Sequence, residues 1–210
     1  LDSTAAESLC ERLELKTGRR PWFQQIDVTD VPALQDSIKS AVAELGPLQA
    51  LVNNAANDQR HSPENVTPES WRDCMAINLD ATFFAAQAAA KIMTEATHQV
   101  KNQVKNQVKS QVKSQGGSII NFSSINALLG PANMPGYVAA KAGIVGLSKA
   151  LAADYGEADI RVNAILPGWV VTERQLDTWL TPEAEADWMK QVSLKQRLLP
   201  EEVANLALFL

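Results

Sequence analysis

The sequence predicts an α/β fold in which helices cover both faces of a doubly wound parallel sheet. Short apolar runs alternate along the chain with longer segments of helical periodicity, which is typical of strand–helix–strand units. Hydrophobic residues make up 46% of the 210 residues and charged residues 20%, a composition that can bury one core. Strands separated by helices of this length pair in parallel through right-handed crossovers. We therefore expect a single domain over residues 1–210.

Composition and charge exclude several classes of protein. The formal net charge of −5 argues against a nucleic-acid binder, which needs a basic surface for phosphates. No apolar run is long enough to span a membrane, and the chain does not open on a secretory signal. The cysteines Cys10 and Cys74 form no CxxC motif, so we expect structural thiols in a reducing compartment. These observations predict a cytoplasmic protein without a cysteine metal site and without nucleic-acid or membrane partners.

The first third of the chain contains signals for two strands and one helix. Residues 22–26 form a short run that predicts a strand. Asp30 can cap the helix that follows, with Pro32 in its first turn and Gly46 at its end. The apolar run at residues 48–52 predicts a buried strand, because two asparagines follow it directly.

The remainder of the chain continues the alternation. Thr67 and a following proline begin a long predicted helix that runs toward Met93. Two further strands are predicted, at residues 118–122 and 160–166, and three further helices, at residues 137–155, 182–192 and 200–210.

Residues 99–115 are a low-complexity insert, QVKNQVKNQVKSQVKSQ, that does not fit this alternation. The valines at steps of four share one face in a helix, and they also share one in a strand, so periodicity does not decide. We expect a solvated, partly helical or disordered extension of the preceding helix. A coiled-coil or partner-binding arm is the alternative, although four valines are few for a coiled coil.

Tyr137 and Lys141 form the strongest chemical motif. Residues four apart lie on one face of a helix. An ammonium beside a phenol favours the phenolate, and it can lower the tyrosine pKa from its usual value of about 10 toward the working pH. The pair can then serve in acid–base catalysis. Alone, the motif is weak, because a surface tyrosine packed on a lysine stem would look the same.

Polar residues at the ends of the predicted strands strengthen this interpretation. Asn53, Ser124 and Pro167 each lie just after a strand, and ligands of open parallel sheets bind at that edge. Asn78 lies inside an apolar helical stretch, where a polar side chain needs a partner. Together these residues predict a catalytic cleft at the strand ends.

In this order, the motifs resemble the short-chain dehydrogenase/reductase family, over almost the whole chain apart from the repeat. The resemblance implies a Rossmann-like fold, a nicotinamide cofactor, a small-molecule substrate and a homo-oligomer, dimeric or tetrameric. It also implies a catalytic tetrad. In it Tyr137 is the acid–base catalyst, and Lys141 lowers its pKa and holds the nicotinamide ribose. Ser124 binds the reacting oxygen, and Asn78 holds a water in a proton relay.

The resemblance further implies where the cofactor binds. Asp2 stands where the family places an acid that accepts the ribose hydroxyls, which favours NAD over NADP, although Asp2 could equally be a terminal residue or a helix N-cap. In the NNAA motif, Ala56 replaces the usual glycine, which adds a Cβ where the cofactor approaches. The other expected cofactor residues lie near the adenine and the nicotinamide: Asp27, Val28, Asn53, Ala55, Pro167, Gly168, Val170 and Thr172.

Two family features are missing. The Gly-rich turn that cradles the diphosphate is absent, and the chain stops inside a helix at residues 207–210. We therefore expect a domain that is incomplete at both ends, without the N-terminal Gly-rich βα unit and the last strand.

Three stretches, NNAANDQRH, NFSSI and WVVTERQ, are similar to bacterial sugar 1-dehydrogenases. This similarity implies oxidation of an aldose at its anomeric carbon to a lactone. Ser124, Asn126, Trp169 and Gln175 would border the substrate, because amides suit sugar hydroxyls and an indole can stack on a pyranose. A reductase of another substrate class, such as 3-oxoacyl thioesters, and a non-catalytic Rossmann-like binding protein remain the alternatives.

Overall fold

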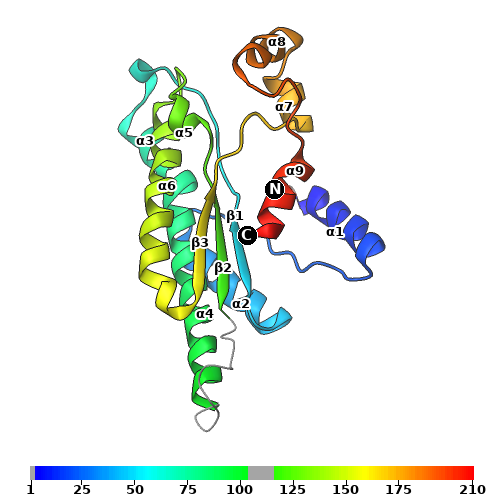
Figure 1. Cartoon of the computed structure of the whole chain (residues 1–210), viewed down its shortest axis with the longest axis vertical. Coiled ribbons are helices and arrows are strands. Elements are labelled where there is room, and N and C mark those ends of the chain that lie inside the picture. The colour runs from blue at the N-terminus through cyan, green and yellow to red at the C-terminus, as the bar shows by residue number, and fades with distance from the viewer. Residues whose placement is uncertain (1–2, 104–115) are drawn as a thin grey trace.

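A computed structural model describes residues 3–103 and 116–210 and has a three-stranded parallel sheet at its centre (Figure 1). The strands are β1 (Ala50–Asn53), β2 (Gly117–Phe122) and β3 (Ile160–Ile165), in the order β1-β2-β3. Helices separate consecutive strands, as parallel pairing requires. The predicted α/β fold with a parallel sheet is therefore confirmed.

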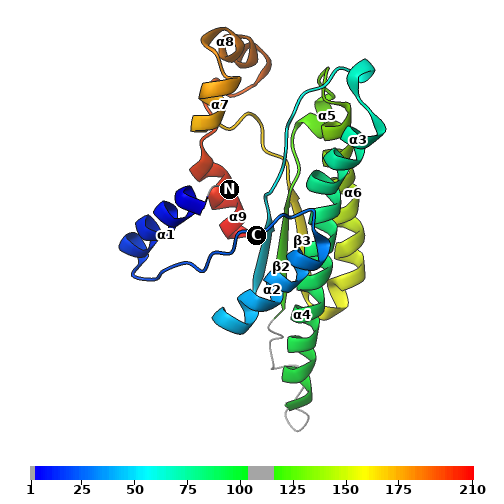
Figure 2. The same ribbon diagram turned by 180° about the vertical axis from the view of Figure 1, so that it is seen from behind.

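One face of the sheet is covered by α2 (Val31–Leu45), α4 (Ala81–Gln103) and α6 (Pro135–Tyr155) (Figure 2). The core between these helices and the sheet consists of small and branched side chains, namely Ala86, Ala89, Ala90, Met93, Ile119, Leu151, Ile160 and Val162. The alanines let α4 lie close to the strands. Gly117 is needed at the start of β2, because a Cβ there would overlap the Met93 side chain.

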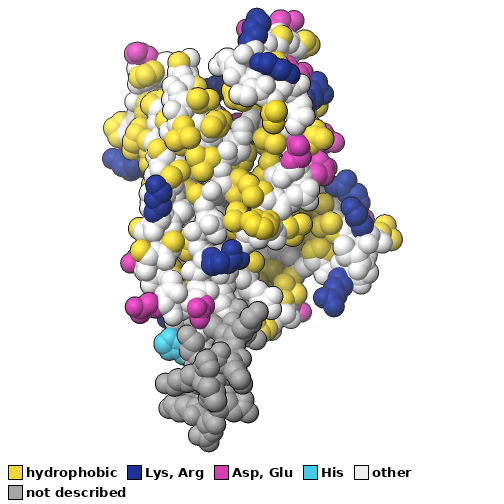
Figure 3. Space-filling view, in the orientation of Figure 1, with side chains coloured by type: hydrophobic (Ala, Val, Ile, Leu, Met, Phe, Trp, Pro, Cys, Tyr) yellow, Lys and Arg dark blue, Asp and Glu magenta, His cyan; other side chains and the backbone are white. Residues whose placement is uncertain are grey.

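The second layer contains α1 (Ser3–Thr17), α7 (Glu173–Thr178), α8 (Pro182–Gln191) and α9 (Pro200–Phe209), on the other side of the sheet (Figure 1). Its attachment to β2 includes a hydrogen bond of 2.9 Å from Ser118 Oγ to the carbonyl oxygen of Leu210. Hydrophobic side chains gather in the middle of this face (Figure 3). Leu208 and Phe209 of α9 are among the exposed large hydrophobic residues, so this layer is packed less tightly than the first.

The long helix predicted from Thr67 is divided into three parts. It begins as α3 (Pro68–Met75), continues through a π-helical turn (Ala76–Asp80) and becomes α4. Thr67 and Ser70 form a capping box at the start. A π-helical turn adds a residue to one turn of the helix and is frequent at functional sites. Here the turn carries Asn78, which is fully buried.

The structure also corrects some predicted boundaries. Residues 22–26 form no strand, because a strand needs a hydrogen-bonded neighbour and, within the described residues, β1 pairs with β2 alone. The strand predicted at residues 48–52 starts two residues later. The helix signals at Asp30 and Gly46 are confirmed, since the Asp30 side chain accepts a hydrogen bond from the backbone of Ala33 and Gly46 adopts a φ of 95°.

Residues 104–115, most of the repeat, lie outside the described residues, as does Asp2. The first residues of the repeat continue α4 up to Gln103. Three short helical segments complete the described part of the chain: α5 (Asn126–Leu129) after β2, a 3-10 turn (Pro63–Asn65) after β1, and a 3-10 turn (Gly156–Ala158) after α6. None of the described helices is long and apolar enough to cross a membrane.

Candidate active site

The carboxyl ends of β2 and β3 stay side by side beyond the last paired residues. The backbone N–H of Ser123 donates to the carbonyl of Ile165 at 2.8 Å, and that of Ile125 donates to the carbonyl of Pro167 at 2.9 Å. Ser124 is thereby held next to the turn that contains Pro167 and Gly168. This is the edge of a parallel sheet at which ligands bind.

Tyr137 and Lys141 come to this edge from α6, which begins at Pro135. The Lys141 Nζ lies 5.7 Å from the centroid of the Tyr137 ring, and Ser124 is hydrogen-bonded to Tyr137 through its side chain. The structure therefore brings together three residues of the predicted tetrad, one from the end of β2 and two from consecutive turns of α6.

Lys141 is almost completely buried, with 2% of its surface exposed. Its Nζ donates to the carbonyl of Phe122 at 2.8 Å, and the Ser123 hydroxyl donates to the Lys141 carbonyl at 2.6 Å. Burial lowers the pKa of Lys141 to about 8, because a charged ammonium is poorly solvated there. Lys141 is thus a cation at neutral pH that is close to losing its charge.

The pKa of Tyr137 is raised above its ordinary value, mainly by burial. The negative charge of Asp58 raises it further, whereas the hydrogen bond from Ser124 and the charge of Arg174 lower it. The sequence predicts the opposite direction, a lowering of the Tyr137 pKa by Lys141. In this structure burial dominates the pKa, and Lys141, whose ammonium is directed at the Phe122 carbonyl, does not lower it.

Asn78 joins the π-helical turn to the segment that follows β1. Its Oδ1 accepts from the backbone N–H of Asn57 at 3.0 Å, and its Nδ2 donates to the carbonyls of Asn57 and Cys74, both at 3.0 Å. These bonds explain why a polar side chain is fully buried in this helix. Both N–H groups of the Asn78 amide therefore bind protein groups, while its Oδ1 keeps one lone pair.

Asn53 lies at the end of β1 and is hydrogen-bonded into the core. Its Nδ2 donates to Oδ1 of Asn121 at 2.9 Å and to the Thr82 carbonyl at 3.3 Å. Asn121 in turn donates to the Ser148 hydroxyl of α6 at 2.9 Å. This buried chain of side chains ties β1, β2 and α6 together. Asn121 escaped the sequence analysis, although an asparagine in the apolar run of β2 was a usable signal.

Lys141 and Tyr137 fit a nicotinamide ribose. Within the described residues, Nζ of Lys141 donates to one protein acceptor only, which leaves two buried N–H groups for a diol. Other predicted cofactor residues lie in the segment after β3 and in the loop before α2. Thr172 caps α7, Val170 is bridged to Leu198, and the exposed Asp27 has its pKa lowered by hydrogen bonds from Thr29.

Two of the predicted substrate residues, Trp169 and Gln175, are hydrogen-bonded to protein groups in this structure. The Trp169 Nε1 donates to Oε1 of Gln175 at 2.7 Å, and Nε2 of Gln175 reaches a carboxylate oxygen of Asp58 at 3.4 Å. Both ends of the Gln175 amide are therefore engaged by protein groups. The Trp169 ring packs edge-on against Trp188, with the ring centroids 6.1 Å apart.

Asn126 lies beside Ser124 at the start of α5. Its backbone N–H donates to the Ser124 hydroxyl oxygen at 3.2 Å, and its Nδ2 lies 4.0 Å from the sulfur of Met134. A thioether is a weak acceptor, so the amide keeps most of its capacity for a stronger partner.

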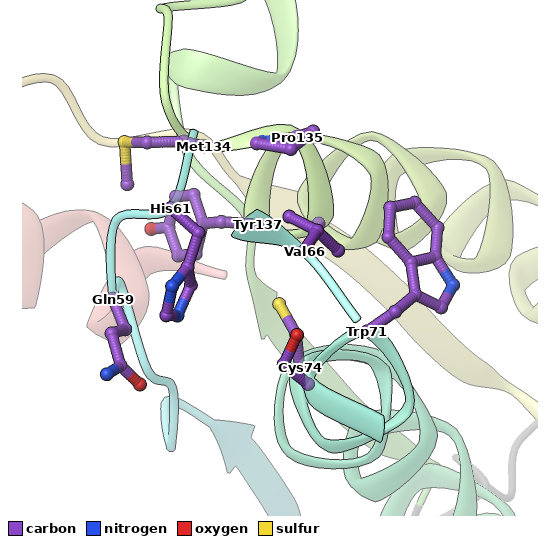
Figure 4. A pocket seen from close by; sticks show the side chains of 10 residues that line it. Gln59, His61, Val66, Trp71, Cys74, Met134, Pro135 and Tyr137 are labelled. Carbon is purple, nitrogen blue, oxygen red and sulfur yellow. The ribbon is translucent and has the colours of Figure 1, made fainter. Parts of the chain in front are cut away.

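A small pocket opens against one side of Tyr137, and Figure 4 shows the His61 ring beside the phenol. Apart from Tyr137, the polar residues that line this pocket were not predicted as site residues, although the segment after β1 is one of the stretches that resemble sugar dehydrogenases. The described residues contain no group of three or more His, Cys, Asp or Glu side chains that could bind a metal. The pocket is lined by Gln59, His61, Val66, Ser70, Trp71, Cys74, Met134, Pro135, Gly136 and Tyr137.

Known proteins with similar sequences include two bacterial sugar dehydrogenases. The chain is 44% identical over 209 residues to the protein named Probable galactose dehydrogenase GalD of Rhizobium meliloti (strain 1021), covering 98% of this chain and 75% of that protein. It is 40% identical over 190 residues to D-xylose 1-dehydrogenase of Caulobacter vibrioides, covering 90% of this chain and 67% of that protein.

A solved structure shares the fold. It is a candidate short-chain alcohol dehydrogenase from Sinorhizobium meliloti 1021, with a TM-score of 0.84 and 29% sequence identity, covering 97% of this chain and 73% of that one. A family model described as short chain dehydrogenase matches residues 2–181. The chain therefore belongs to the short-chain dehydrogenase family, and it is an oxidoreductase that acts on CH–OH groups.

Proposed function

We propose that the protein oxidises an aldose at its anomeric carbon to the corresponding lactone, with NAD as the hydride acceptor. The observation that carries this proposal is the convergence of Ser124, Tyr137 and Lys141 at the strand ends. The choice of substrate is supported by the relatives named as galactose and xylose dehydrogenases. The reaction consumes an aldose and oxidised cofactor and yields a lactone, reduced cofactor and one proton.

In this mechanism, Tyr137 acts as the general base. Its phenolate accepts the proton of the anomeric hydroxyl while the hydride leaves the same carbon. A bound oxidised nicotinamide would accept this hydride and would place a positive charge beside Tyr137. The Ser124 hydroxyl holds the reacting oxygen in line with the phenol, because it is already hydrogen-bonded to that side chain.

Lys141 has two roles in the proposal. Its two spare N–H groups hold the ribose hydroxyls, and its charge, which lies 5.7 Å from the centroid of the Tyr137 ring, stabilises the phenolate. Asn78 fixes the segment after β1 through Asn57, and we infer that it also supports the water of a proton relay beside Lys141.

The cofactor proposed is NAD rather than NADP, on the basis of Asp2. A carboxylate at that position accepts both ribose hydroxyls and repels a 2′-phosphate. Replacing Asp2 with alanine should narrow the preference for NAD, measured as the ratio of kcat/KM with the two cofactors. Equal or better efficiency of the unaltered enzyme with NADP would overturn this assignment.

We also propose that the enzyme works as a cytoplasmic homo-oligomer, dimeric or tetrameric. Light scattering coupled to size exclusion measures its mass directly. A monomer that is fully active would contradict the proposed assembly.

The function is tested by following the absorbance of reduced nicotinamide with a panel of substrates. The panel contains D-galactose, D-xylose, a polyol without an anomeric carbon, and a 3-oxoacyl thioester assayed in the reductive direction. We expect the aldoses to give the highest kcat/KM and a lactone product, and Asn126→Ala to raise KM for them more than it lowers kcat. A preference for the polyol or the thioester would reject the aldose assignment.

A further inference from the structure

The short segment at residues 57–61, which follows β1, is anchored to two of the elements that carry the catalytic residues. Asn57 exchanges two hydrogen bonds with the buried Asn78 side chain, through its N–H and its carbonyl, both at 3.0 Å. The backbone N–H of His61 donates to the carbonyl of Asn133 at 2.8 Å, just ahead of α6. The ends of the segment are thus fixed on the π-helical turn and on the entrance to the tyrosine helix.

Asp58 and Arg60, in the middle of the same segment, contact side chains at the two ends of α7. One oxygen of the Asp58 carboxylate accepts from Nη2 of Arg174 at 2.5 Å, and the other lies 3.4 Å from Nε2 of Gln175. The guanidinium of Arg60 lies over the Trp179 ring, 4.1 Å from its centroid. Two residues of the segment therefore hold both ends of α7, which has only six residues and little stability of its own.

We propose that Asp58 is a specificity-determining positioning residue, which holds Gln175 and Arg174 of α7 at the mouth of the catalytic cleft so that the segment from Trp169 to Gln175 can bind a polyhydroxy substrate. This inference rests on the proposed function, because it concerns how the same cleft recognises an aldose. Asp58 contacts Arg174 and Gln175 directly, and it is linked to Trp169 through Gln175, which accepts a hydrogen bond from the Trp169 Nε1 at 2.7 Å.

Among the described residues, the Asp58–Arg174 pair joins parts of the chain much further apart in sequence than the other ion pairs do. Lys39–Asp36 and Lys190–Asp187 each join neighbouring turns of a single helix, and their side chains are largely exposed. The Asp58–Arg174 pair joins residues 116 positions apart, and the Asp58 side chain is only 24% exposed. A pair of this kind fixes the relative position of two chain segments, as the Arg197–Glu185 pair also does for α8 and the segment before α9, whereas the pairs three residues apart stabilise one helix locally.

Both members of the pair also act on the catalytic phenol. The negative charge of Asp58 raises the pKa of Tyr137, and the positive charge of Arg174 lowers it. The Cys74 thiol raises the pKa of Tyr137 as well. Removing one charge should therefore shift the acidic limb of the pH profile in the direction opposite to removing the other.

The test compares Asp58→Asn, Arg174→Gln and the double variant with the full-length enzyme, on the best substrate found in the panel. Asp36→Asn, which removes an acid from the exposed pair in α2, is the matched control. We expect Asp58→Asn to raise KM for an aldose roughly tenfold, with a smaller change in kcat and in KM for the cofactor. Arg174→Gln should raise KM as well, and the double variant should be no worse than Asp58→Asn, because the pair acts as a unit.

The pH profile of kcat/KM gives a second readout that a purely structural role would not move. Asp58→Asn should shift the acidic limb to lower pH, and Arg174→Gln should shift it to higher pH, while Asp36→Asn should leave it unchanged. An unchanged KM in Asp58→Asn, or shifts of the same sign in the two variants, would overturn the proposal. If the best substrate is not an aldose, the proposed function fails, while opposite shifts would still assign Asp58 to the cleft.

Discussion

At the residue scale, the least expected feature of the molecule is the burial of Lys141. An ammonium with 2% exposure costs free energy unless it is well solvated by protein groups, and the described residues offer it one carbonyl. The folded state therefore holds this proton less tightly than the unfolded chain does. The buried ammonium therefore serves function at the expense of folding stability, and its removal should change the free energy of unfolding.

Replacing Lys141 with methionine tests this conclusion. The variant should lose turnover, yet its free energy of unfolding at pH 7 should rise by about 1–2 kcal/mol. The lost desolvation cost is of the order of 3 kcal/mol for the shift to a pKa of about 8, and the Phe122 carbonyl loses a bond of about 1 kcal/mol. Urea unfolding at pH 7 measures the difference, and a less stable variant would contradict the account.

The same lysine predicts how stability depends on pH. Its pKa is about 8 in the folded protein and has the ordinary lysine value of about 10.5 in the unfolded chain. Between these values the unfolded chain binds more protons, so the contribution of Lys141 to stability rises with pH across this window and is constant below it. Urea titrations at pH 7.5 and 9.5 should show this rise in the unaltered protein and a smaller one in Lys141→Met. Equal pH dependence in both would show that Lys141 is not the titrating group.

At the scale of elements, buried polar side chains join the sheet to its helices. Asn121 lies on β2 with no exposed surface, and it links Asn53 of β1 to Ser148 of α6. Asn121→Ala removes both bonds and leaves a small cavity, while Asn53 keeps its bond to the Thr82 carbonyl and Ser148 its bond to the Ile144 carbonyl, so we expect a loss of roughly 2–4 kcal/mol. Denaturant unfolding measures this loss. A change below about 1 kcal/mol, within the scatter of ordinary surface substitutions, would show that the network is not needed.

Thr97 on α4 is a buried polar side chain without a hydrogen-bond partner among the described residues. Valine has nearly the same shape without the hydroxyl, so Thr97→Val should leave activity unchanged and stabilise the protein by about 1 kcal/mol. The measurement is the midpoint of urea unfolding at constant slope. Destabilisation would mean that the hydroxyl has a partner after all.

The elements also show what can be predicted from sequence. The positions of α6, β2 and β3 followed from apolar periodicity, and the pairing of Tyr137 with Lys141 followed from their spacing on one helix. The strand predicted at residues 22–26 was wrong, since pairing depends on a neighbour elsewhere in the chain. The Asp58–Arg174 pair could not be predicted, because it joins segments 116 residues apart that only the tertiary fold brings together.

At the scale of the whole molecule, we expect the repeat at residues 99–115 to be separable from the described core. The last buried side chain described on α4 is Thr97, and β2 begins at Gly117. Replacing residues 99–115 with a short Gly-rich linker should therefore preserve the melting temperature and kcat, because the entropic cost of a loop depends weakly on its length. Loss of solubility or of assembly in this variant would instead identify the repeat as an interface.

The central claim is that Tyr137 transfers the proton in an aldose dehydrogenase. The most direct test is the turnover of Tyr137→Phe with the preferred aldose, together with its affinity for reduced cofactor measured by fluorescence. Phenylalanine keeps the ring and removes the hydroxyl, so kcat should fall by about 10² to 10⁴ while cofactor affinity changes little. A variant that retains most of the activity of the unaltered enzyme would contradict the mechanism.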